Sequence, residues 1–155
     1  LASADARLPN VLVHEALLQG RLPQFGGYDT FRRESVYGDS RLDLDITGRG
    51  GRCLIETKSV TLVVEGAALF PDAPTTRGRK HVETLAQAVR DGHRGAAIFV
   101  VQRDDAGLMT PNDLADPEFG VALRKAVKAG VEVYAYGCRV TKDEILLGGE
   151  LPVRL

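Results

Sequence analysis

The run "GAAIFVVQ", residues 95–102, constrains the fold of this chain more than any other feature. It is apolar at consecutive positions, which is typical of a central strand covered on both faces. Segments with helical signals lie before and after it, at residues 75–92 and 116–130. The pattern therefore predicts an α/β fold, in which a sheet is flanked by helices.

The two helical segments have recognisable ends. A threonine before Arg77 can cap the first helix, and Gly92 can close it. Asp116 is placed to cap the second helix, Pro117 takes its first position, and Gly130 lies just past its end. A third, shorter helix is predicted near the start of the chain, over residues 10–20, where Asn10 can cap it and Gly20 can end it.

The remaining segments have the composition of strands. Residues 41–47, "RLDLDIT", alternate strictly, which predicts Leu42, Leu44 and Ile46 on one face and the two aspartates on the other. The turn "GRGG" should join this strand to the next one as a hairpin. The expected strands are residues 28–38, 41–47, 52–64, 95–102 and 131–140, with an edge hairpin or tail over 144–155. The element order is then α-β-β-β-α-β-α-β in a mixed sheet.

Composition excludes several classes of protein. The chain has 155 residues, enough for one domain, and a net charge of −1, so any nucleic-acid contact must come from a local basic patch. No apolar run approaches the length of a membrane-spanning helix. The two cysteines have no metal-ligand spacing and imply no disulfide framework, so a cytoplasmic location is expected. Aromatic residues make up 6% and tryptophan is absent, which argues against a base-stacking surface.

The beginning of the chain has neither an initiator methionine nor the charged-then-apolar order of a signal peptide. Residues 1–8 are therefore expected to be the remnant of a preceding domain or a linker. Residues 9–155 are expected to form one domain.

Glu56 and Lys58 interrupt the apolar strand over residues 52–64. Alternate residues of a strand share a face, and the hairpin would bring Asp43 and Asp45 within reach of them. Carboxylate oxygens are the ligands that Mg²⁺ prefers, and a nearby lysine can orient water or stabilise charge on a phosphate. With 21 acids and 5 lysines, chance gives about 0.7 acid-x-Lys triplets in such a chain, so the triplet alone is weak. The alternative is a cross-strand salt bridge on a solvated face. Asp45, the next residue on the face of Asp43, is expected to be a solvated neighbour.

Six stretches, in order, match one known family. They are "LPNVLVHEAL", "GYDTFRRES-YGDSRLDLDI", "IETKSVTL", "LFPDAPTTRGRKHVETL", "GHRGAAIFVVQRDD" and "DPEFGVALRKAVKAGVEVYAY". On these residues the chain resembles the sugar fermentation stimulation protein A family over nearly all of its length. The resemblance implies a PD-(D/E)xK nuclease-like domain with a restriction-endonuclease-like core, α-β-β-β-α-β. It also implies a small oligonucleotide-binding barrel in front of that domain, missing from this chain.

The resemblance assigns roles to individual residues. Asp43 matches the first acid of the motif, a metal ligand, although leucine rather than proline precedes it. Glu56 matches the second acid and Lys58 the motif lysine. Glu15 matches a place on the first helix where many such nucleases have another acid, but it also fits the polar line of a buried helix.

Basic and polar residues near this motif are candidates for phosphate contacts. A helix begins at "TTRGRKH", where backbone N–H groups and cations together can bind a phosphate. Arg41 shares strand parity with Asp43, and either contacts a phosphate or pairs with Asp43 or Asp39. The candidates are Arg41, Arg77, Arg79, Lys80 and His81, with Ser40 and Gln102 as further ones.

The function expected on these grounds is that of a DNA-binding, Mg²⁺- or Mn²⁺-dependent nuclease. Asp43, Glu56 and the backbone carbonyl of Thr57 would hold the metal, and Lys58 would position the attacking water. The alternatives are a non-catalytic DNA-binding regulator of sugar metabolism that retains the fold, and a nuclease directed at RNA. The sequence leaves the preferred DNA structure open, as well as the choice between monomer and homodimer.

Overall fold

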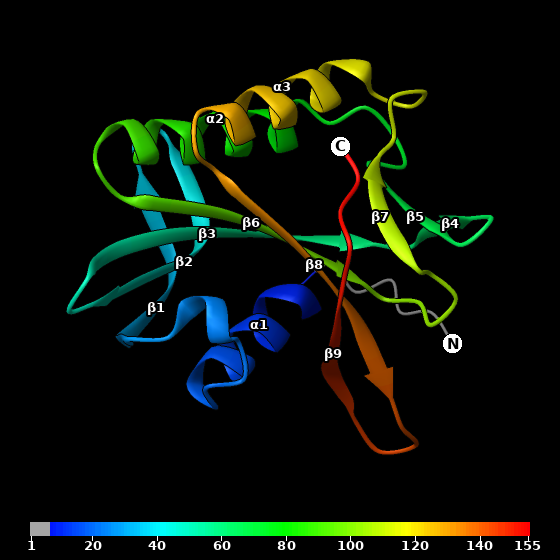
Figure 1. Ribbon diagram of the computed structural model, residues 1–155, viewed down its shortest axis with the longest axis horizontal. Coiled ribbons are helices and arrows are strands. Elements are labelled where there is room, and N and C mark those ends of the chain that lie inside the picture. Colours follow the sequence, from blue (N-terminus) through cyan, green and yellow to red (C-terminus); the bar gives the residue numbers. More distant parts are fainter. Residues whose placement is uncertain (1–6) are drawn as a thin grey trace.

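A six-stranded mixed sheet forms the centre of the protein, in the strand order β1-β2-β3-β6-β8-β9 (Figure 1). The computed structural model describes residues 7–155. β2 is antiparallel to both of its neighbours, β1 and β3. β3, β6 and β8 run parallel, and β9 is antiparallel to β8. The strands are β1 (Tyr28–Tyr37), β2 (Ser40–Gly48), β3 (Gly51–Val60), β6 (Arg94–Val101), β8 (Glu132–Val140) and β9 (Ile145–Leu151).

Helices cover both faces of this sheet. α1 (Leu8–Leu18) packs on one face, whereas α2 (Thr76–Arg90) and α3 (Pro117–Lys128) lie side by side on the other (Figure 1). The residues of β6 are almost all buried, as expected of a central strand. The predicted core order α-β-β-β-α-β, a mixed sheet flanked by helices, is therefore confirmed.

The ends of α2 and α3 follow the predicted signals. The side chain of Thr75 accepts a hydrogen bond from Gly78 N, and that of Asp116 accepts one from Phe119 N. Beyond both helices the chain turns at a glycine with positive φ, Gly92 and Gly130. α2 packs on the sheet where Leu85 of the helix faces Gly95 of β6. A Cβ at Gly95 would lie 2.8 Å from the carbonyl oxygen of Leu85. The absence of a side chain there lets α2 approach the sheet closely.

Two boundary predictions are wrong. The first helix begins at Leu8, so Asn10 is a buried residue inside α1 and not its cap. The predicted strand 52–64 ends at Val60, because the following residues leave the main sheet. They form β4 (Leu62–Val64), which joins β5 (Ala67–Phe70) and β7 (Leu108–Pro111) in a separate three-stranded sheet. A short 3₁₀ helix, Pro23–Phe25, connects α1 to β1.

The predicted alternation of β2 is also wrong at one position. Leu44 and Ile46 pack on the α1 side, but Leu42 belongs to the core on the α2 side. The change of face occurs at Asp43, and Glu34 on β1, between the pairs Arg33–Leu44 and Ser35–Leu42, has a φ of 55°. The pairing register is continuous across this position, so the face changes without an inserted residue.

Among residues 7–155, no helix is long and apolar enough to span a membrane. Cys53 and Cys138 are both free thiols. Of the predicted remnant at residues 1–8, residues 1–6 lie outside the described part of the chain.

Candidate active site

The two motif acids lie where β2 and β3 stop pairing. The ladder between these strands ends at Leu44 and Ile55, and Asp43 and Glu56 are the next residues of each strand. Glu56 Oε1 accepts the backbone N–H of Asp43 at 3.1 Å. In return, Asp43 Oδ2 accepts the backbone N–H of Thr57 at 2.8 Å and its hydroxyl at 2.7 Å. Carboxylates thus take over backbone hydrogen bonds that the ladder no longer provides.

Asp43 is held from its other side by α1. Asn10 Nδ2 donates to Asp43 Oδ1 at 3.3 Å, and Arg33 Nε of β1 donates to Asn10 Oδ1 at 3.2 Å. Burial and the neighbouring negative charge of Glu56 raise the pKa of Asp43 above its ordinary value, although the hydrogen bonds from Thr57 act in the opposite direction. A cation bound here would relieve this repulsion between the two acids.

Glu56 is 4% exposed and faces two basic side chains. Lys58 Nζ lies 3.0 Å from Glu56 Oε2, so the two residues share a face as predicted. His81 Nδ1, from α2, is 2.6 Å from the same oxygen and 2.8 Å from Lys58 Nζ. Burial alone would raise the pKa of Glu56, but the hydrogen bond with His81 and the charge of Lys58 outweigh it and lower that pKa. Glu56 is therefore ionised at neutral pH.

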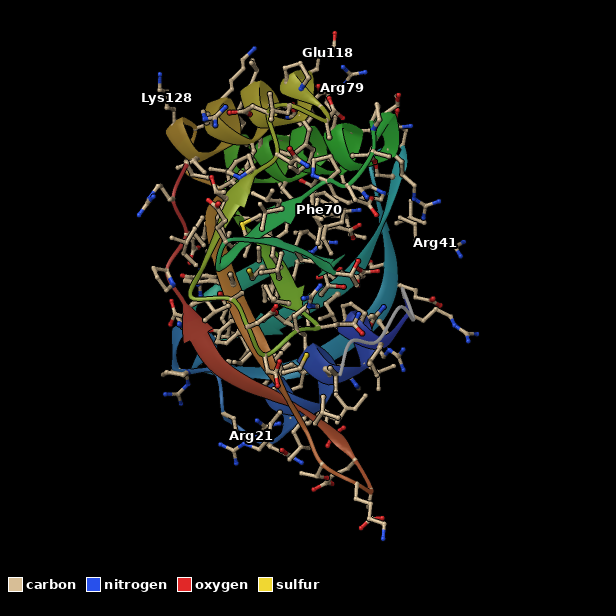
Figure 2. All side chains as sticks on the ribbon, turned by 90° about the vertical axis from the view of Figure 1, so that its right-hand side faces the viewer. Arg21, Arg41, Phe70, Arg79, Glu118 and Lys128 are labelled. Carbon is tan, nitrogen blue, oxygen red and sulfur yellow. The ribbon has the colours of Figure 1, made fainter. Side chains whose placement is uncertain are left out.

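These residues line one cavity of about 350 Å³, whose walls come from three parts of the fold. α2 contributes Arg77 and, one turn later, His81, which lie on the same side of the helix. β5 contributes Phe70, which lies beneath α2 and packs against two further rings, Phe99 and Phe119 (Figure 2). The cavity is lined by Asp43, Glu56, Thr57, Lys58, Ser59, Phe70, Arg77 and His81.

Gln102 does not line this cavity but is hydrogen-bonded to Ser59, which does. It follows the last residue of β6, is buried, and its Nε2 donates to Ser59 Oγ at 2.6 Å. Gln102 thus supports the wall of the cavity through Ser59, which lines it.

Two of the predicted basic residues face away from the acids. Arg79 pairs with Glu118 of α3, as Figure 2 shows, and Lys80 Nζ lies 3.4 Å from Asp39. Both line a separate groove of about 620 Å³ between α2 and the turn that joins β1 to β2. Arg79 lies on the opposite side of the helix from Arg77 and His81, and Lys80 extends toward Asp39 in the turn between β1 and β2.

The other predicted residues lie outside the lining of the cavity. Ser40 is buried, with its hydroxyl 2.8 Å from that of Thr84 on α2. Arg41 is exposed and extends outward from β2 (Figure 2). Glu15 lies on α1, and the α1 side chain that contacts Asp43 is that of Asn10.

Asp45 is not the solvated neighbour of Asp43 that the sequence suggested. It is 6% exposed; its register partner on β3 is Leu54, and Arg52, two residues before Leu54, reaches it diagonally. Arg52 donates to both of its oxygens, at 3.0 and 2.7 Å, and Ser35 Oγ donates to Oδ2 at 3.0 Å. Asp45 therefore belongs to a structural ion pair and does not reach Glu56.

The donor set fits a divalent cation with few protein ligands. Within residues 7–155, no group of three or more His, Cys, Asp or Glu side chains is placed to hold a metal. Mg²⁺ requires only one or two carboxylates, because it keeps several of its waters. Asp43 and Glu56, with their oxygens close together in a polar cavity, satisfy that requirement.

A family model described as the sugar fermentation stimulation protein RE domain matches residues 7–144. Two similar proteins are sugar fermentation stimulation protein homologs from Desulforamulus reducens and from a Thermoanaerobacter species. Each is 46% identical over all of this chain, which spans 65% of the length of the first and 67% of the second. These relatives therefore extend beyond the part that matches this chain.

The fold is also similar to a solved structure, that of Pyrococcus furiosus SfsA in complex with Ca²⁺. The TM-score is 0.90 and the sequence identity 33%, with 96% of this chain and 65% of that chain covered. Together with the strand order, this similarity supports the nuclease-like fold class predicted from the sequence.

Proposed function

The chain belongs to the sugar fermentation stimulation protein family, and we propose that it is a metal-dependent nuclease that hydrolyses phosphodiester bonds in DNA. One observation carries the proposal. Asp43, Glu56 and Lys58 converge in a single cavity, and Arg77 lines the same cavity. Two acids can hold a divalent cation, and an amine and a guanidinium can stabilise charge on a phosphate, which together suit phosphodiester hydrolysis.

Asp43 and Glu56, together with the backbone carbonyl of Thr57, would hold Mg²⁺ or Mn²⁺. The Ca²⁺ complex of the P. furiosus relative supports a divalent cation in this family. When bound, such a cation polarises a phosphoryl oxygen and makes water a better nucleophile. Asp43 and Glu56 also keep each other in place through the hydrogen bonds at the end of the β2–β3 ladder.

The other side chains act on the substrate. Lys58 Nζ lies beside Glu56, where its ammonium group would orient the attacking water and stabilise charge on the phosphate. Arg77 would bind a phosphate at the beginning of α2, where backbone N–H groups add to its charge. Phe70 would close one side of the cavity with an apolar wall.

The test uses supercoiled, linear and branched DNA with Mg²⁺ or Mn²⁺. We expect cleavage by the protein and its loss in Glu56→Ala and in Lys58→Ala. Lys128→Ala is the control, because Lys128 is exposed at the end of α3, away from the cavity. Cleavage that persists unchanged in both active-site variants would refute the mechanism.

The same assay separates the alternatives. Tight DNA binding without cleavage would favour a non-catalytic regulator of sugar metabolism that retains the fold. Cleavage of RNA alone would identify a nuclease directed at RNA. Sedimentation of the protein with and without DNA would distinguish a monomer from a homodimer. The cytoplasmic location and the preceding oligonucleotide-binding barrel remain predictions that accompany the proposal.

A further inference from the structure

The imidazole of His81 closes a triangle of three side chains in the cavity. Its Nδ1 is 2.6 Å from Glu56 Oε2 and 2.8 Å from Lys58 Nζ, and those two atoms are 3.0 Å apart. His81 is 5% exposed, so its ring is buried against the motif residues and turned toward them. Glu56 and Lys58 both come from β3, whereas His81 comes from α2.

Lys58 needs such a neighbour because its side chain has a long, flexible stem. Its ammonium group has two described contacts, Glu56 Oε2 and His81 Nδ1. Glu56 is also a proposed metal ligand, so its oxygen is shared between the cation and the lysine. His81 Nδ1 also lies 2.6 Å from that oxygen, so it can accept from Lys58 only when it does not donate to Glu56. A cation on the Glu56 oxygen would leave Nδ1 to accept the hydrogen bond from Lys58.

We propose that His81 is a positioning residue, which holds Lys58 beside the scissile phosphate instead of binding a phosphate itself. The inference rests on the proposed nuclease function. It assigns to the helix a role in orienting the catalytic amine, in addition to the phosphate contact of Arg77. The sequence alone had grouped His81 with the phosphate-binding residues of the helix start.

The packing of α2 on the sheet fixes the distance between His81 and the strands. One turn after His81, the carbonyl oxygen of Leu85 lies so close to Gly95 of β6 that a Cβ there would approach it to 2.8 Å. Helix and strand are therefore in close contact next to the site. The position of His81 is set by the core of the protein, before any substrate arrives.

The atom that makes the contacts suggests a matched set of variants. Asparagine can place an amide atom near the position of Nδ1, whereas the longer glutamine places it near Nε2. We expect His81→Ala and His81→Gln to lower kcat about 100-fold, the loss that a misplaced catalytic group commonly causes. His81→Asn should retain most of the wild-type kcat. The affinity for DNA, measured in Ca²⁺, should stay unchanged in all three variants.

Opposite results would overturn the proposal. Weaker DNA binding with an unchanged kcat would show that His81 binds phosphate. Equal losses of kcat in His81→Asn and His81→Gln, in step with a lower Tm, would show that the ring only stabilises the fold.

A second measurement does not depend on cleavage. The order of the Lys58 ammonium group, from ¹⁵N relaxation, should fall in His81→Ala and His81→Gln and persist in His81→Asn. Unchanged order in all three variants would refute the positioning role, even if the wild-type protein cleaves no DNA. A wild-type protein that cleaves nothing but shows the expected changes in order would refute the proposed function alone.

Discussion

Glu56 Oε1 accepts the backbone N–H of Asp43 at 3.1 Å, at the point where β2 and β3 stop pairing. The carboxylate of one motif acid thus fixes the backbone of the other. The site is consequently built into the sheet and does not depend on a mobile loop. It also means that substitutions of these acids should act on stability as well as on the proposed metal binding.

Asp43→Asn should raise the Tm of the metal-free protein at neutral pH. The folded state raises the pKa of Asp43, so its charged form opposes folding above that pKa, and the amide removes the charge. The difference from wild type should shrink as the pH falls through the raised pKa, because wild-type Asp43 then becomes protonated. Thermal unfolding at several pH values measures both effects.

The same variant should lose its response to Ca²⁺. At a Ca²⁺ concentration 100 times the Kd, a bound cation stabilises the wild type by about 2.7 kcal/mol. Asp104→Asn, at an exposed position outside the cavity, is the control and should respond like wild type. A variant that keeps the full Ca²⁺ response would exclude Asp43 as a ligand.

Asn10→Asp should strengthen cation binding and weaken the metal-free fold. The new carboxylate would replace the amide that donates to Asp43 Oδ1, which adds a third acid beside the other two. The metal-free protein should lose about 1 to 3 kcal/mol of unfolding free energy, because a hydrogen bond becomes a repulsion. Calorimetric Ca²⁺ titration and urea unfolding measure these effects, with Asn10→Ala as the control that removes the donor without adding charge. A weaker affinity for Ca²⁺ in Asn10→Asp would contradict the prediction.

Arg52→Met should destabilise the fold without affecting the site. It leaves the buried carboxylate of Asp45 without its main partner, a loss of about 2 kcal/mol since Arg52 is partly exposed. Burial alone would raise the pKa of Asp45, but the hydrogen bonds from Arg52 and Ser35 lower it. The stabilisation that the Arg52–Asp45 pair gives is therefore fully present above the unfolded-state pKa of Asp45. It is lost as the pH falls through the lower pKa that Asp45 has in the folded state.

The difference in stability between wild type and Arg52→Met should narrow below about pH 4, the ordinary value for aspartate. Urea unfolding at neutral and acid pH measures it. The double variant Arg52→Met, Asp45→Asn should recover part of the loss, because no buried charge remains. A difference in unfolding free energy that does not depend on pH would mean that the packing of Arg52 on Tyr37 dominates instead. The Cζ atom of Arg52 lies 5.2 Å from the centre of that ring.

Arg77→Ala should weaken DNA binding more than Arg79→Ala does. Arg77 lines the cavity, whereas Arg79 is engaged with Glu118 and faces the other groove. Loss of one phosphate contact should reduce the slope of log Kd against log salt by about 1. Binding titrations in Ca²⁺ over a range of salt concentrations measure this slope. Equal salt slopes for Arg77→Ala and Arg79→Ala would mean that the DNA contacts both the cavity and the separate groove.

Much of the fold could be predicted from the sequence, because its main elements have strong local signals. The continuous apolar run at β6 and the caps at Thr75 and Asp116 each depend on neighbouring residues only. The pairing of Glu56 with Lys58 also follows from strand alternation. Such signals can be read without knowing the contacts between distant segments.

The features that could not be predicted depend on contacts between distant segments. The change of face at Asp43 accompanies a left-handed Glu34, a residue type that gives no signal for that conformation. Asn10 had the position of a helix cap, and only the packing of α1 shows that it contacts Asp43. Phe70 comes from a four-residue strand in a second sheet, too short for a periodic pattern.

The end of the β2–β3 ladder gives the protein two built-in reporters. The amide protons of Asp43 and Thr57 are bound by carboxylates and not by the carbonyls of a neighbouring strand. Their rates of hydrogen–deuterium exchange and their chemical shifts therefore report on those carboxylates, while the amides of the paired strands report on the opening of the sheet. When a cation draws on the same oxygens, these two signals should shift before any others in β2 and β3. Occupancy of the site can thus be followed at two backbone positions, without substrate and without an attached probe.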